Sequence, residues 1–205
     1  MSLSTYAGLK TAIAGWLTRT DTDTYVADWI TLAEARIGRE LRVDQILARS
    51  ASTLTAEFMA VPTNFLAPKS MRLTAGTKRL LQYLTTEQMA VWQSRLGLGA
   101  VQAYSRIGSQ FWFYPAPTAS DAVELIYYAA IPALSLTNAT NWLLTSHPDA
   151  YLRATLLEAA LFYEDNELVG TYSKLFSDSI GAISDAAKRD AFASNINPTA
   201  SGQVV

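Results

Sequence analysis

The sequence contains no cysteine and a single histidine, His147. Disulfides, thiol nucleophiles and structural zinc sites built from cysteines are therefore excluded. No run reaches the ~18–20 apolar residues that a membrane-spanning helix needs, and the first residues lack the basic flank and apolar stretch of a signal peptide. We expect a protein of cytoplasmic origin that contacts no membrane.

An excess of positive charge is also missing. Lysine and arginine number 16 against 18 aspartates and glutamates, giving a formal net charge of -2. Strong binding to nucleic acid depends on basic groups that neutralise phosphates, so this balance argues against tight DNA binding. Lysines and arginines are scattered and often lie beside acidic residues, which is typical of a solvated mixed surface.

The residues that are present predict a folded globular chain. Half of the 205 residues are hydrophobic and 17% are charged, a balance that disordered chains do not have. The length suits one domain with a full core, or one domain carrying a small insertion. No internal repeat is visible.

Helices are predicted at both ends of the chain. Apolar residues recur every three or four positions over residues 4–18 and 26–41, with a polar loop between them. Arg36 and Glu40 lie four apart and are placed to pair on the second helix. Two further helices are predicted after residue 146, where Pro148 suits a first helical turn, while residues 131–145 read as a loop.

The middle of the chain has the pattern of β-strands. Short β-like runs occur at 52–55, 71–73 and 80–84, and a helix is predicted over 87–96. Gly108 and Ser109 separate two runs, which predicts a tight hairpin of 104–107 with 110–114. A last strand over 123–128 would place Val123, Leu125 and Tyr127 on one face.

These elements predict an α+β fold, in which N- and C-terminal helices (residues 4–47 and 147–193) form a bundle and a small antiparallel β region (about 49–131) is inserted. Residues 1–193 would form a single domain. Residues 194–205 are polar and small apart from three apolar side chains, and we expect a flexible tail. The three are Ile196, Val204 and Val205.

Catalytic chemistry is poorly represented. Glu34 and Glu158 could act as the acid and base of a glycan hydrolase, but both lie on amphipathic helices, and we expect them in structural or interface ion pairs. His147 has no partner at metal-ligand spacing. No Gly-rich loop has the spacing that cradles phosphates, so we expect no catalytic residue, no metal and no cofactor.

One strand carries aromatic side chains on both of its faces. They are Phe111, Trp112, Phe113 and Tyr114. A strand with one solvated face would not tolerate this pattern. Either both faces are covered within the fold, or one face contacts another subunit, which makes these four residues interface candidates together with Ile196, Val204 and Val205 of the tail.

Several segments together resemble the head-tail adaptor, or head-completion, proteins of tailed bacteriophages. The most distinctive is Ala33-Glu34-Ala35-Arg36-Ile37, within the stretch 28–37. Similarity continues, in order and in spacing, through segments that span most of the chain: residues 16–19, 58–66, 108–117, 124–128, 140–144 and 156–160. Val61 and Asn64 stand where the family has leucine and aspartate.

The resemblance implies a non-enzymatic structural protein of the virion neck, assembled in the host cytoplasm. It implies a homo-oligomeric ring, usually of twelve subunits, that docks beneath the portal protein and offers a platform to a tail or neck protein. Genome DNA would pass through its channel without specific binding, which a weakly acidic protein suits. Two alternatives stay open, a cell-wall glycan hydrolase using paired carboxylates and a small DNA-binding module.

The tail generates the first testable prediction. A chain truncated after Ala193 should keep its helical circular dichroism signal but bind portal rings about tenfold more weakly, a loss of ~1.4 kcal/mol, because a segment that orders on contact contributes interface area. Affinity for purified portal rings is the measurement. Unchanged affinity would mean that the docking surface lies on the helices or the β region.

Overall fold

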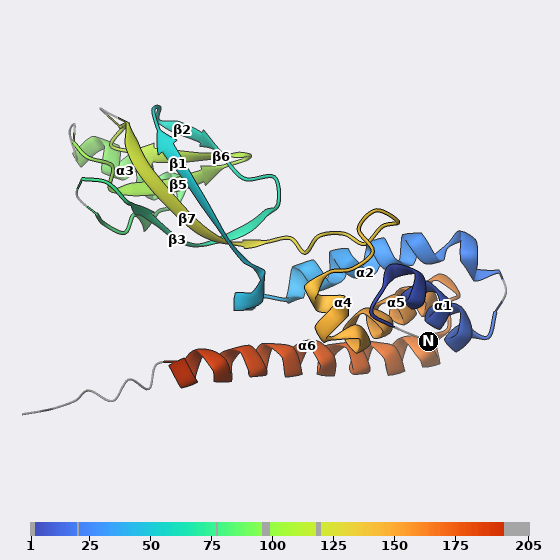
Figure 1. The fold of residues 1–205 in the computed structure, drawn as a ribbon. Helices are drawn as coiled ribbons and strands as arrows, with labels where there is room; N and C mark the ends of the chain where they lie inside the picture. Colours follow the sequence, from blue (N-terminus) through green and yellow to red (C-terminus); the bar gives the residue numbers. More distant parts are fainter. Residues whose placement is uncertain (1–2, 20, 77, 96–98, 118–119, 195–205) are drawn as a thin grey trace, which may run out of the picture. The chain divides into compact units, whose positions relative to one another are not determined.

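The structure is a computed structural model that describes residues 3–19, 21–76, 78–95, 99–117 and 120–194. Its contacts divide the chain into two compact units (Figure 1). The helical unit is the described part of Met1–Val43 and Ile131–Val205, and the β unit is that of Asp44–Ala130. The α+β class and the β insertion between terminal helices are confirmed, while the single-domain organisation stays a prediction.

The first two helices of the helical unit follow the predicted pattern. Helix α1 (Tyr6–Leu17) is capped by Thr5, whose side chain accepts a hydrogen bond from the Gly8 N–H at 3.1 Å. A short 3-10 turn, η1 (Thr22–Thr24), precedes α2 (Val26–Glu40). Each helix buries one apolar stripe, because its polar residues occupy the opposite face.

Helix α5 (Pro148–Phe162) is the centre of the helical unit and packs against α1, α2, α4 and α6. Small and apolar residues cover nearly its whole circumference, and all but one of the residues from Ala150 to Ala160 are buried. The spacing of apolar residues predicts a buried stripe of only Leu152, Leu156, Ala159 and Tyr163, which understates the burial. A helix enclosed on all sides needs no polar face.

Helix α4 (Trp142–Ser146) corrects the prediction of a loop over 131–145. The side chain of Asn141 accepts a hydrogen bond from the Leu144 N–H at 2.9 Å and so caps the helix start. Five residues are too few to show a helical period. Helix α6 (Asn166–Ser194), the long red helix of Figure 1, follows α5 and buries Phe176, Ile180 and Ile183.

The β unit contains two sheets. The three-stranded sheet has the order β1 (Leu47–Leu54), β7 (Asp121–Ala129), β3 (Phe65–Leu73), with antiparallel neighbours. The four-stranded sheet has the order β2 (Phe58–Ala60), β6 (Gln110–Tyr114), β5 (Ala103–Ile107), β4 (Gln82–Tyr83), and β4 runs parallel to β5. A 3-10 turn, η2 (Asp44–Ile46), precedes β1, and α3 (Thr86–Arg95) lies between β4 and β5.

The predicted hairpin is confirmed as β5 and β6, and Gly108 adopts the left-handed conformation that its turn requires. Strand β2 was not predicted, and β1 and β3 are longer than the runs that indicated them. Helix α2 ends at Glu40 and the 3-10 turn η2 reaches Ile46, so the expected helical segment of residues 4–47 is not one continuous helix up to its end.

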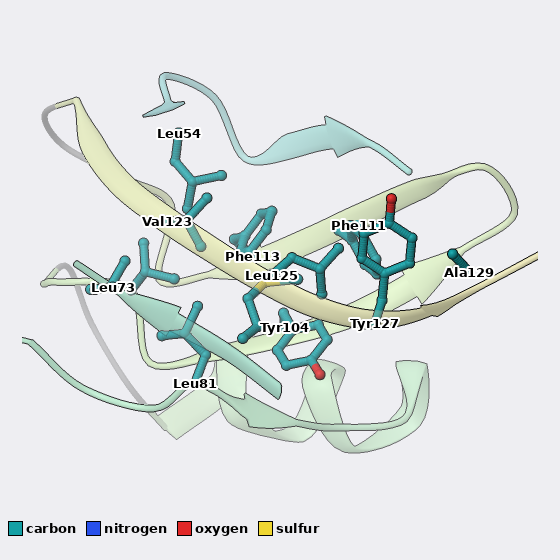
Figure 2. Packing of buried hydrophobic residues seen from close by; sticks show 12 residues of the cluster. Leu54, Leu73, Leu81, Tyr104, Phe111, Phe113, Val123, Leu125, Tyr127 and Ala129 are labelled. Atoms are coloured by element: carbon teal, nitrogen blue, oxygen red, sulfur yellow. The ribbon is translucent and has the colours of Figure 1, made fainter. Parts of the chain in front are cut away.

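The core of the β unit is apolar and rich in aromatic rings. Val123, Leu125 and Tyr127 of β7 are buried on one face, as the alternation predicts. They join Phe111 and Phe113 of β6, and Figure 2 shows these side chains gathered in one cluster. The rings of Phe111 and Tyr104 meet edge to face with centroids 5.9 Å apart, an arrangement that aromatic pairs prefer.

Candidate functional site

The aromatic strand β6 is covered on both faces within the β unit. Phe111 and Phe113 are fully buried in the main core. On the opposite face Trp112 and Tyr114 pack beside α3, where Trp112 Nε1 donates to Glu57 Oε1 at 2.5 Å and the Tyr114 hydroxyl donates to the Gln93 carbonyl at 3.3 Å. One face of the strand is therefore fully buried and the other is half-buried.

The interface role of these aromatic residues stays a prediction. Phe111 and Phe113 have no exposed surface with which to contact a partner, whereas Trp112 and Tyr114 are half-buried. The tail candidates Ile196, Val204 and Val205 lie outside the described residues.

Glu158 forms a structural ion pair. Arg36 Nε donates to Glu158 Oε1 at 2.6 Å, and the Glu158 side chain is only 9% exposed. This pair joins α2 to α5. The expected pairing of Arg36 with Glu40 is wrong, because the guanidinium turns instead to a carboxylate that is buried and would be costly to leave unpaired.

Glu34 has neutral partners. Its Oε1 accepts hydrogen bonds from the Leu134 N–H at 2.7 Å and from the Tyr151 hydroxyl at 3.2 Å. The ion pair expected for Glu34 is therefore not formed among the described residues. Burial raises the pKa of Glu34 above its usual value, although both hydrogen bonds act in the opposite direction. The network ties the segment after Ile131 to α2 and α5.

His147 occupies a structural position. Its backbone N–H donates to the Leu143 carbonyl at 2.7 Å, and its ring meets the Trp142 ring edge to face at 6.2 Å between centroids. Nearby Asp149 and Arg153 help to line an open cavity of about 230 Å³. Among the described residues no three His, Asp or Glu side chains are grouped so that they could hold a metal ion.

The helical unit exposes aromatic surface that the sequence patterns did not indicate. Tyr25 and Phe162 are 40% and 50% exposed, and their ring centroids lie 4.8 Å apart beside the buried Trp29. Trp16 is 61% exposed. Phe162 ends α5 outside the predicted stripe, so periodicity did not single it out.

A basic pocket in the β unit was also missed. Arg49, Arg72, Lys78 and Arg79 line an open cavity of about 560 Å³ together with Glu124. The Glu124 side chain is 2% exposed and is paired with both Arg49 and Arg72. Hydrogen bonds from these guanidiniums hold the pKa of Glu124 below its usual value against the effect of burial. The expected scattering of cations is therefore wrong for this face.

Comparison with known families identifies the chain. A model of the SU10 adaptor protein family matches residues 4–200. The chain belongs to the SU10 adaptor protein family. This is a family of phage head-tail adaptors, which gives this SU10 adaptor a structural role at the head-tail junction of the virion. A search of curated proteins finds no match. In the described ranges, no helix has the length and apolarity to cross a membrane.

The Glu34 network generates a stability prediction. The pKa of Glu34 is higher in the folded chain than in the unfolded chain. The contribution of Glu34 to the stability of the fold is therefore fully present below the unfolded pKa and is lost as pH rises through the folded pKa. Glu34→Gln keeps an acceptor oxygen and cannot ionise. Between pH 4 and pH 7, the free energy of unfolding of Glu34→Gln, measured by urea denaturation, should increase relative to that of the wild type.

Glu34→Ala is the matched control for this network. It leaves the Leu134 N–H and the Tyr151 hydroxyl without their acceptor, so it should destabilise the protein by about 1–3 kcal/mol at both pH values. Two results would contradict the buried network. One is an equal loss of unfolding free energy in the Gln and Ala variants, and the other is a Gln variant whose stability falls relative to that of the wild type as pH rises.

Proposed function

We propose that this SU10 adaptor assembles into a closed ring of twelve subunits that docks beneath the portal and presents a platform to a tail or neck protein. The observation that carries the proposal is the family match over residues 4–200. The ring would extend the channel through which genome DNA passes without specific binding. The ring would act through contacts with other proteins and would not catalyse a reaction.

The placement of the carboxylates supports a structural role over glycan hydrolysis. A hydrolase of that kind needs two carboxyl groups that converge on one substrate bond. Glu158 is paired with Arg36, while Glu34 accepts hydrogen bonds from Leu134 and Tyr151. Each carboxylate thus connects elements of the helical unit, which is a structural role.

The exposed aromatic residues support a role in assembly. The rings of Tyr25 and Phe162 contact each other at a tilted angle, and both side chains are partly exposed in the single chain. Exposed aromatic surface is typical of protein contacts. The basic pocket does not favour the DNA-binding alternative, because its cations converge on one cavity and two of them are paired with Glu124.

Reconstitution from purified components tests the proposed position in the neck. The chain should sediment with portal rings, and the tail or neck protein should join the complex only when the chain is present. Sedimentation of each pair and of the three-component mixture is the measurement. A tail or neck protein that binds portal equally well without this chain would contradict the adaptor role proposed here.

The hydrolase alternative has its own test. Purified protein incubated with peptidoglycan should release no soluble glycan above the level of buffer alone, with lysozyme as the positive control. Activity that disappears in Glu34→Gln or Glu158→Gln, while both variants keep the wild-type circular dichroism spectrum, would overturn the non-enzymatic reading.

A further inference from the structure

The basic pocket of the β unit is built by the backbone. Arg49 lies on β1 and Arg72 on β3, the two strands that flank β7 and its Glu124. After β3 the chain turns back, and the Leu73 N–H donates to the Arg79 carbonyl at 2.9 Å while the Leu81 N–H donates to Met71 at 2.8 Å. This return places Lys78 and Arg79 in the pocket wall.

The pocket carries an excess of positive charge. Among the described residues that line it, Glu124 is the one acidic side chain, and its carboxylate is already occupied by Arg49 and Arg72. Lys78 and Arg79 have no carboxylate partner among the described residues. One Arg79 nitrogen donates to the Ala100 carbonyl at 3.0 Å, whereas its buried Nε has no hydrogen-bond partner in the described part of the chain.

This concentration contrasts with the charge of the whole protein, which is -2. Four cations against one carboxylate make the cavity attractive to anions. Arginine presents a planar fork that matches a carboxylate in two-point hydrogen bonds, and such charge-assisted bonds are stronger than neutral ones. Arg49 and Arg72 also keep surface open to solvent, since these side chains are 70% and 57% exposed.

We propose that this pocket is a docking site for an acidic segment of a protein partner, whose carboxylates bind Lys78, Arg79 and the free edges of Arg49 and Arg72. The inference deepens the proposed function and rests on it for the kind of partner, a virion protein. Apolar Leu73 and Leu80 also line the cavity, and Leu80 is 69% exposed. The aliphatic parts of the acidic side chains and the backbone of a peptide can pack on this surface.

The same geometry favours a peptide over nucleic acid. Tracking a nucleic-acid backbone takes cations spread along a groove and aromatic rings on which bases stack. Here the cations converge on a single cavity of about 560 Å³, and none of the described residues that line it is aromatic. Carboxylates on neighbouring side chains of a short segment fit this compact arrangement.

The test uses the full chain and a fluorescent hexaglutamate peptide, with binding followed by anisotropy. Lys78→Glu should weaken peptide binding about tenfold, the order expected for loss of one charge-assisted contact. Lys174→Glu is the matched control, because it makes the same change in net charge at an exposed lysine of α6 in the helical unit. The control should bind the peptide with an affinity within about twofold of that of the wild type, because it changes only the long-range electrostatic attraction, which salt screens.

Competition with other anions and a second variant identify the ligand class of the pocket. An unlabelled DNA hexamer and inorganic phosphate should each displace the peptide less well than unlabelled hexaglutamate. Stronger displacement by DNA would assign the pocket to nucleic acid, and stronger displacement by phosphate to a small anion. Arg79→Gln should reproduce the loss if Lys78→Glu melts abnormally. Equal losses in Lys78→Glu and Lys174→Glu, or no saturable binding, would overturn the inference whatever the portal experiment gives.

Discussion

Strand β7 sets the constraint on which the β unit depends. It is the middle strand of its sheet, so the register of both neighbours is fixed against it. Its inward side chains, Val123 and Leu125, enter the core, while the alternation of a strand turns Glu124 to the other face. A slip of one residue would place this carboxylate in the core and expose the apolar set. The two arginines that satisfy Glu124 come from β1 and β3, so one ionic network joins all three strands and also lines the basic pocket.

The helical unit depends on α5 in a comparable way. Because this helix is enclosed by its neighbours, the polar groups around it must be satisfied locally. Arg36 reaches Glu158 from α2, and the Tyr151 hydroxyl reaches Glu34. The Asn141 amide in turn donates to the Tyr151 oxygen at 2.7 Å. The two carboxylates that a glycan hydrolase would need thus hold elements of the helical unit together. The aromatic pair of Tyr25 and Phe162 stays exposed, and we propose it as surface for assembly.

Local patterns predicted the parts of this fold that are local. The hairpin at Gly108, the alternation in β7 and the helical stripe of α2 could be predicted, since each depends on neighbouring residues. The three-residue β2 and five-residue α4 were missed because they are too short to show a period. The ion pair between Arg36 and Glu158 spans 122 positions. The basic pocket likewise forms only when β1 and β3 pair with β7, and no spacing along the chain reveals that register. The family was predictable because its segments recur in order.

The most direct test of the proposed role is the mass of the complex formed with an intact portal ring, measured by native mass spectrometry. We expect one dominant species whose mass exceeds that of the portal ring by twelve copies of the chain, unchanged when more of the chain is added, because a closed ring has no free end to extend. A series of masses that grows with added protein, or a portal ring that remains unoccupied, would contradict assembly of this SU10 adaptor as a closed ring on the portal.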